Sequence, residues 1–237
     1  MLYIVSMPIG NPEDITLRAL HVLQQVDAIV CEERREAMRL LRHYQIDPVL
    51  IDLNEHNEQV RIPELLERLE HQETLALISD HGTPLLADPG TRWVAQVIQR
   101  RLPVSPVPGT SSLLAALVIS GLPMDRFRFV GLLPAKKPER LAALARLKRE
   151  PDTCVVLEVP YRLAPLLTDL NAVLGSARRI AVGCDLTMPT EQVIRGTTQN
   201  VLEYFLKHPF KGEFVIVIDG ARADLRRTEF RSRRLNG

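Results

Sequence analysis

The stretch "ISDHGTPLLADPG", Ile78 to Gly90, begins as the end of an apolar strand and continues for twelve residues that include two Asp, a His, two Gly and two Pro. A usual strand-to-helix connection needs only a few residues, so this one is unusually long. Two prolines stiffen its backbone, and two glycines permit tight turns. Parallel α/β sheets bind ligands at the carboxyl ends of their strands. The stretch therefore predicts an α/β fold in which this loop holds a ligand.

Alternating strands and helices extend from this loop in both directions. Apolar runs typical of strands buried on both faces occupy residues 2–6, 27–31, 74–79 and 104–107. Helical periods separate these runs, and we expect the helix after the loop to have Asp88 as its N-cap and Pro89 at its first position. The pattern restarts near residue 122, with strands at 127–131, 153–158, 179–184, 192–195 and 213–219 and helices at 139–149, 162–174 and 198–207. We expect two α/β domains, residues 1–119 and 122–220, and a mobile basic tail over residues 221–237.

The composition is that of a folded chain in a reducing compartment. The 237 residues are 46% hydrophobic and carry a formal net charge of +1, enough to build a sizeable core. The three cysteines form no CxxC pair, which favours the cytoplasm over a disulfide framework and predicts no metal site. We find no apolar run long enough to cross a membrane.

Two further loops follow predicted strands and could complete a site with the first. "SMPIGNPED", Ser6 to Asp14, is stiffened by prolines but lacks both GxxxxGK[ST] and GxGxxG, so it is not a phosphate loop. "PVPGTSSLLAALVISG", Pro106 to Gly121, turns into a helix that we expect to start at Thr110, Ser111 or Ser112. A helix start with free N–H groups and several hydroxyls suits a small carboxylate or a ligand that carries hydroxyls.

Four segments in register carry a resemblance to a known family: "LYIVSMPIGNPEDITLRAL" (2–20), "ISDHGTPLLADPG" (78–90), "VPGTSSLLAALVISGLPMDRFRFVGLLP" (107–134) and "FKGEFVIVIDG" (210–220). Over nearly all of residues 2–220 the chain resembles the bacterial small-subunit ribosomal RNA cytidine-2′-O-methyltransferase family, a branch of the tetrapyrrole methylase superfamily. The resemblance implies two α/β domains of the tetrapyrrole methylase type with S-adenosylmethionine in the cleft between them, usually in a homodimer. It also implies methylation of a cytidine ribose in small-subunit ribosomal RNA, with that RNA or the small ribosomal subunit as the partner.

The resemblance assigns roles to particular positions. The expected contacts to the methyl donor are Pro8, Ile9, Asp80, Gly82, Thr83, Pro84, Leu86, Ser111, Ser112, Leu186, Gly212, Glu213 and Phe214. Glu32 follows a strand end and is the first candidate for the proton acceptor, or for the group that orients Arg35. Candidates for contact with RNA phosphates are Arg34, Arg35, Lys136, Lys137, Arg140 and Arg162.

Several positions depart from the family pattern. "CEERREA" at 31–37 keeps Glu32 and Arg35 but has Glu33 and Arg34 where Asp and Thr are usual. "VPYR" at 159–162 replaces Ser-Pro-His-Arg, and "CDLTM" at 184–188 replaces Arg-Glu-Leu-Thr-Lys. These departures on the acceptor side keep two alternatives open. One is a methyltransferase of the same fold with a tetrapyrrole or protein acceptor, and the other is a non-catalytic module that binds S-adenosylmethionine or RNA.

Overall fold

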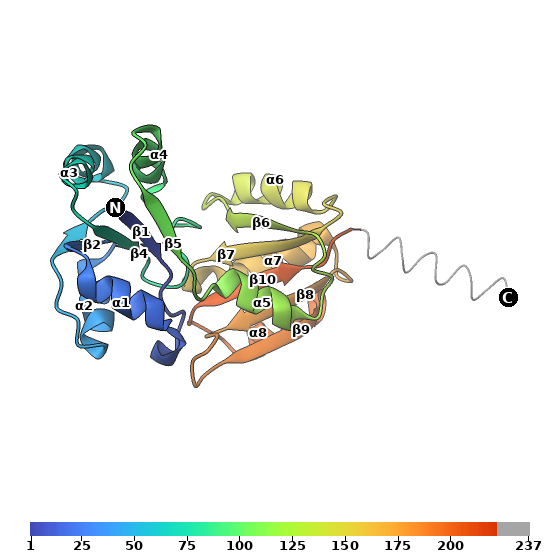
Figure 1. Cartoon of the computed structure of the whole chain (residues 1–237). Coiled ribbons are helices and arrows are strands. Elements are labelled where there is room, and N and C mark those ends of the chain that lie inside the picture. Colours follow the sequence, from blue (N-terminus) through green and yellow to red (C-terminus); the bar gives the residue numbers. More distant parts are fainter. Residues whose placement is uncertain (222–237) are drawn as a thin grey trace. The chain divides into compact units, whose positions relative to one another are not determined.

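The computed structural model describes residues 1–221, which form two compact units (Figure 1). The first unit is Met1–Ser111 and the second begins at Ser112. The sequence pattern placed the boundary at residue 119, but helix α5 (Ser112–Ser120) belongs to the second unit, because it contacts four strands of the second sheet. Apart from Ala221, the predicted basic tail lies outside the described residues.

The first unit is built on a five-stranded sheet with the order β3-β2-β4-β1-β5, and all of its strand pairs are parallel. The expected parallel sheet is therefore confirmed. Strand β3 and helix α2 are additions that the sequence pattern did not predict. The strands are β1 (Leu2–Val5), β2 (Ala28–Cys31), β3 (Leu50–Asp52), β4 (Leu75–Ile78) and β5 (Val104–Val107).

Helices cover both faces of this sheet. They are η1 (Pro12–Asp14), α1 (Leu17–Gln25), α2 (Arg34–His43), α3 (Glu58–Glu70) and α4 (Thr91–Gln99). Helices α1 and α2 bury Leu23 and Leu41 against one face, and α3 and α4 bury Leu65 and Trp93 against the other (Figure 1). Three layers with two apolar cores hold the carboxyl ends of the strands in place.

Helix α4 begins later than the sequence predicted. Its N-cap is Gly90 in the left-handed region, with φ +105°, and not Asp88. A Cβ at Gly90 would lie 3.2 Å from Cδ2 of Leu77, so a larger residue would crowd the core as well as strain the backbone. Oε1 of Glu58 accepts the Gly90 N–H at 3.1 Å, and the Asp88 carboxylate is therefore available for the loop itself.

The second unit contains a mixed five-stranded sheet with the order β6-β7-β10-β8-β9. Strands β6 and β7 are parallel, whereas the pairs β7–β10, β10–β8 and β8–β9 are antiparallel. Its elements after α5 are β6 (Phe127–Leu132), α6 (Lys137–Leu147), β7 (Thr153–Glu158), η2 (Pro160–Arg162), α7 (Leu163–Leu174), β8 (Arg179–Cys184), β9 (Gln192–Thr197), α8 (Thr198–Lys207) and β10 (Phe214–Ile218).

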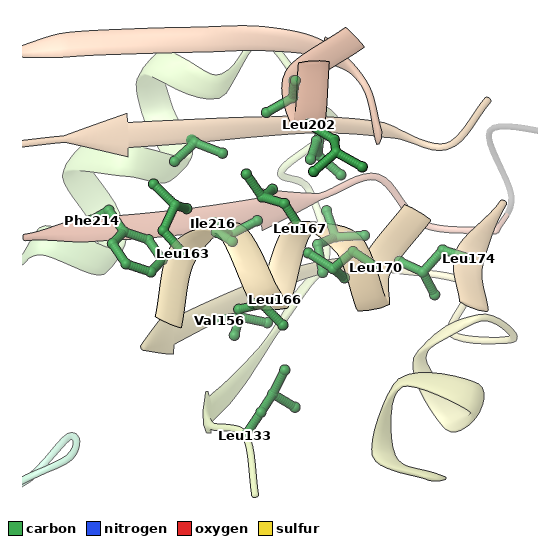
Figure 2. Close-up of a cluster of buried hydrophobic side chains, with 14 of the residues drawn as sticks. Leu133, Val156, Leu163, Leu166, Leu167, Leu170, Leu174, Leu202, Phe214 and Ile216 are labelled. Carbon is green, nitrogen blue, oxygen red and sulfur yellow. The ribbon is translucent and has the colours of Figure 1, made fainter. Parts of the chain in front are cut away.

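The core of the second unit lies between its sheet and helices α6, α7 and α8. Figure 2 shows leucines of α7, among them Leu166 and Leu170, packed with Val156 and Ile216 of the strands. Because side chains alternate along a strand, α5 packs on the other face, where it contacts β7, β8, β9 and β10. Arg195 of β9 donates from both Nε and Nη2 to the Ile119 carbonyl, which fixes the end of α5.

Candidate functional site

The three loops singled out in the sequence meet at one edge of the first sheet. Strands β4, β1 and β5 are parallel neighbours, so their carboxyl ends lie side by side. The Met7 N–H donates to the Gly82 carbonyl at 2.8 Å, which joins the loop after β1 to the loop after β4. The Thr83 hydroxyl donates to the Thr110 carbonyl at 2.9 Å, and the Thr110 hydroxyl donates to the Met7 carbonyl. The loops therefore form one hydrogen-bonded unit.

Two glycines allow this close packing. Gly82 has φ +74°, and a Cβ there would lie 3.0 Å from Cγ2 of Ile9. A Cβ at Gly109 would lie 3.0 Å from Cβ of Ser6. A side chain at either position would push the loops apart. Because both residues are glycine, the backbones of the loops lie close together, and their N–H and C=O groups are available to a ligand.

Asp80 brings a buried acceptor to this edge. Its Oδ1 is buried and has no hydrogen-bond partner within the part of the chain that the structure describes. Burial raises the pKa of Asp80, Asp88 raises it further, and His81 opposes the change. A buried acceptor without a partner is uncommon in folded proteins, and a ligand that donates a hydrogen bond would satisfy it.

Asp88 holds the same loop in shape. Burial raises the pKa of its carboxyl, and hydrogen bonding with the Ser79 hydroxyl and the Leu85 N–H opposes this rise. Leu85 has φ +75°, a backbone strain that such a bond compensates. In the loop itself, the Ser79 hydroxyl donates to the His81 carbonyl at 3.0 Å. The Ser79 hydroxyl also accepts the His81 N–H at 3.2 Å. Asp88 thus belongs to the loop and is not the N-cap of α4 that the sequence predicted.

Glu32 lies directly after β2 and is half-buried. Burial raises the pKa of its carboxyl, and the nearby charges of Asp88 and Asp80 raise it further. Arg34 and Arg35 begin helix α2 and are exposed, and Nη1 of Arg34 lies 3.8 Å from Oδ1 of Asp52. The carboxyl of Glu32 and the guanidinium groups of Arg34 and Arg35 therefore follow one strand end.

The remaining expected donor contacts of the first unit differ in exposure. Pro8, Ile9 and Pro84 are buried, whereas Leu86 is exposed. Helix α5 begins at Ser112, which is one of the three expected starts. The boundary between the two units lies at the same place, so Ser111 belongs to the first unit and Ser112 to the second.

In the second unit a strained loop follows β8. Asp185 and Thr187 have φ +46° and +67°, and side chains other than glycine rarely adopt these values. The Asp185 N–H donates to the Glu213 carbonyl at 2.8 Å, which ties this loop to the segment before β10. Gly212 faces the Asp185 carboxylate so closely that a Cβ would overlap it. One end of this sheet therefore gathers the expected donor contacts Leu186, Gly212, Glu213 and Phe214. The sequence did not predict the left-handed backbone of Asp185 and Thr187 that shapes this end.

The cations proposed to contact RNA do not form one exposed set. Arg140 is 7% exposed, and its Nε donates to Oδ2 of Asp169 at 2.9 Å. It also donates from Nη1 to the Ala135 carbonyl at 2.8 Å, so its expected role as a phosphate contact is corrected to a structural ion pair. Lys136 and Lys137 are exposed, at 80% and 70% of their side chains. Arg162 lies between these extremes and pairs with Glu158 at 3.2 Å.

Residues 1–221 contain no group of three or more His, Cys, Asp and Glu side chains arranged to hold a metal ion. The same residues contain no helix long and apolar enough to span a membrane.

Comparisons with known proteins identify the family of the chain. Residues 1–202 match the family described as Tetrapyrrole (Corrin/Porphyrin) Methylases. A Synechocystis protein named Ribosomal RNA small subunit methyltransferase I is 43% identical over 221 residues, covering 93% of this chain and 79% of that protein. A protein of the same name from Xylella fastidiosa is 42% identical over 222 residues, covering 93% and 81%.

Solved structures share the fold at lower identity. Uroporphyrin-III C-methyl transferase from Thermus thermophilus, complexed with S-adenyl homocysteine, has a TM-score of 0.63 at 20% identity, covering 92% of this chain and 96% of that one. A diphthine synthase has a TM-score of 0.70 at 13% identity, covering 92% and 89%. The fold and the relatives define a methyltransferase whose methyl donor is S-adenosylmethionine. The chain belongs to the tetrapyrrole methylase family, and within it to the ribosomal RNA small subunit methyltransferase I family.

The residues present fit this donor. Its ribose hydroxyls and its ammonium group can donate to a buried acceptor such as Oδ1 of Asp80. The loops held together by Gly82 and Gly109 offer backbone groups beside that acceptor.

Proposed function

We propose that the protein methylates the 2′-hydroxyl of a cytidine ribose in small-subunit ribosomal RNA. The observation that carries the acceptor is the 42–43% identity, over 93% of the chain, to relatives named as ribosomal RNA small subunit methyltransferases. The specific nucleotide and atom come from the sequence resemblance. A cytoplasmic location, which the cysteine pattern favours, and a homodimer, which the resemblance implies, belong to this proposal.

The donor is held by the joined loops of the first unit. S-adenosylmethionine supplies an electrophilic methyl group, so the chain has to align an acceptor with it. Oδ1 of Asp80 accepts a hydrogen bond from a donor hydroxyl or ammonium group, and Thr83 adds a hydroxyl next to it. Asp88 keeps the loop in its binding shape through Ser79 and Leu85.

Glu32 removes or relays the proton of the acceptor hydroxyl. Its burial raises the pKa of the carboxyl, which makes the carboxylate a stronger base than an exposed glutamate. Arg35, three residues further on and exposed, orients the RNA next to it. Glu32 acts only on the acceptor hydroxyl and not on the donor, so its loss affects turnover more than donor binding.

The test is methyl transfer from labelled S-adenosylmethionine to three fractions: small ribosomal subunits from a strain without this gene, naked ribosomal RNA, and RNA-free cell extract. We expect label in the subunits or the RNA. Alkaline hydrolysis then locates it, because a methylated 2′-oxygen blocks cleavage at its own nucleotide.

Two variants control this experiment. Asp80→Ala removes the proposed donor contact, whereas Asp47→Ala changes an exposed aspartate of the same unit. We expect Asp80→Ala to lose methyl transfer and Asp47→Ala to retain it. Label in protein or in a tetrapyrrole would replace the acceptor proposed here, and donor binding without transfer to any fraction would indicate a binding module.

A further inference from the structure

Tyr161 is an exposed aromatic residue that the donor site does not use. It lies in η2, directly after strand β7, and is 76% exposed. The apolar cluster of the second unit includes its neighbour Leu163 but not Tyr161 itself. An aromatic ring at this exposure contributes little to the core, so its role has to be sought in its surroundings.

The ring is held in place although it is exposed. Cζ of Arg162 lies 5.5 Å from the ring centroid, within the range of a cation–π interaction. Nη1 of Arg162 is itself bound to Glu158, at 3.2 Å from Oε1 and 3.3 Å from Oε2. The Glu158 side chain is 1% exposed, and its Oε1 also accepts the Val159 N–H at 2.9 Å. A buried carboxylate thus fixes the arginine that orders the tyrosine.

The backbone on either side is fixed as well. Pro160 restricts φ before the tyrosine, and the Arg162 N–H donates to the Val159 carbonyl at 3.0 Å. Leu163 follows and is 2% exposed in the core of the unit, next to Phe214 in Figure 2. Because the ring has little freedom to lose, a flat ligand could stack on it at a low entropic cost.

Exposed cations lie at the same edge of the sheet. Strands β6 and β7 are parallel, with Leu132 paired to Leu157, so the loop that carries Lys136 and Lys137 follows the same strand ends as Tyr161. Phe214 pairs with Glu158, which brings the segment before β10, with exposed Lys211, to this edge. An exposed aromatic ring and exposed ammonium groups at one edge of a sheet match the bases and the phosphates of a nucleic acid.

We propose that Tyr161 stacks on an unpaired base of the RNA acceptor while Lys136 and Lys137 contact neighbouring phosphates. The inference rests on the proposed function, in that the acceptor is RNA. A duplex offers no free base face at this site, so the preferred ligand is single-stranded.

The direct test compares two strands of equal charge. The first is oligocytidine of about 15 nucleotides, and the second is an abasic sugar-phosphate strand of the same length. Tyr161→Ala should weaken binding of the first on the order of tenfold, as expected for the loss of one stacked base, and leave the second unchanged. Tyr161→Phe should retain most of the affinity, because the ring remains.

The matched control is Phe127→Ala. Phe127 is also an exposed aromatic, at 42%, but it starts β6 and so lies at the opposite end of the same strands. The Phe127→Ala variant should bind both strands as the wild type does. Equal effects of Tyr161→Ala on both strands, or no effect on either, would overturn the stacking role.

A spectroscopic readout is independent of affinity. Tyr161→Trp places an exposed indole at the site, and the wild type supplies the background of Trp93, which is fully buried. Oligocytidine should quench the added fluorescence and the abasic strand should not. If the wild type methylates small subunits while Tyr161→Ala keeps its KM for them, the inference fails and the proposed function stands. If no RNA takes label, the proposed function fails.

Discussion

Replacement of Asp80 by alanine should strengthen the fold and weaken the site at once. In the protein without donor, Oδ1 of Asp80 is buried without a partner, and burial raises the pKa of the carboxyl. An unsatisfied buried polar atom costs about 1–3 kcal/mol. Asp80→Ala removes this cost, so we expect the free energy of unfolding to rise by about 1–2 kcal/mol at neutral pH.

The pH dependence gives the sign of this effect. The folded-state pKa of Asp80 lies above its unfolded value of 3.8, so the folded chain holds this proton to a higher pH than the unfolded chain does. The contribution of Asp80 to stability therefore falls as the pH rises from 3.8 through the folded-state pKa, and then stays constant. The advantage of Asp80→Ala should grow over that window and be smallest below it. Urea unfolding across a pH series measures it, with Asp47→Ala as the control.

Donor affinity should change in the opposite direction. If Oδ1 of Asp80 accepts a hydrogen bond from the donor, its loss costs about 1–3 kcal/mol, or about 5- to 150-fold in Kd. Calorimetric titration with S-adenosylmethionine and with S-adenosylhomocysteine measures this. A variant that binds both as tightly as the wild type, or that unfolds more easily at neutral pH, would refute the assignment of Asp80 as an unpaired acceptor for the donor.

Three further predictions concern residues that the sequence analysis expected on the acceptor side. Arg140→Ala should lower the free energy of unfolding by about 3–5 kcal/mol in chemical denaturation, because it leaves a buried charge on Asp169; Arg140→Met with Asp169→Leu should recover much of the loss. Lys136→Ala with Lys137→Ala should leave stability nearly unchanged and reduce the salt dependence of single-stranded RNA binding by about 0.7 log units per lost phosphate contact; an unchanged slope would remove both lysines from the RNA surface. Glu32→Gln should lower kcat for methyl transfer while the Kd of the donor stays within about twofold. As the pH is lowered, the wild-type rate should begin to fall at a pH above the ordinary 4.5 of a glutamate, because the pKa of Glu32 is raised; equal loss of donor binding would place Glu32 in the donor site.

The parts of the fold that the sequence predicted are those with a local signal. The strands 153–158 and 179–184 and the helix 198–207 agree with the structure to the residue, because each is bounded by turn or charged residues. Strand β3 has only three residues, too few to show a clear alternation. Helix α2 does have an amphipathic period, with Ala37 and Leu41 on its buried face, but this period was not recognised among its many charged residues. The direction of pairing in the second sheet has no local signal, since it depends on which strands become neighbours.

The candidate site divides in the same way. The loops at Ser6, Ile78 and Pro106 were visible because proline fixes the backbone φ and glycine permits turns wherever they occur, and the structure joins these loops through their own backbone groups. The prediction that Asp88 caps helix α4 was wrong, because Gly90 in the left-handed region is the N-cap and Glu58, from a distant helix, accepts its N–H.

Arg140 shows that a charged residue can follow the period of the core. It lies three residues after Lys137 and four before Leu144, and α6 turns Arg140, Leu144 and Leu147 to the same buried face. Lys137 and Arg140 both point toward Asp169, but the ammonium group stays exposed at 3.9 Å while the guanidinium is buried at 2.9 Å. The apolar period alone would have placed Arg140 inside. Its burial is possible because Asp169, on a helix 29 residues away, supplies the opposite charge, and that partner is fixed by the packing of α6 on α7. Among the cations of this helix start, exposure therefore separates the two lysines that can reach RNA from the arginine that holds the unit together.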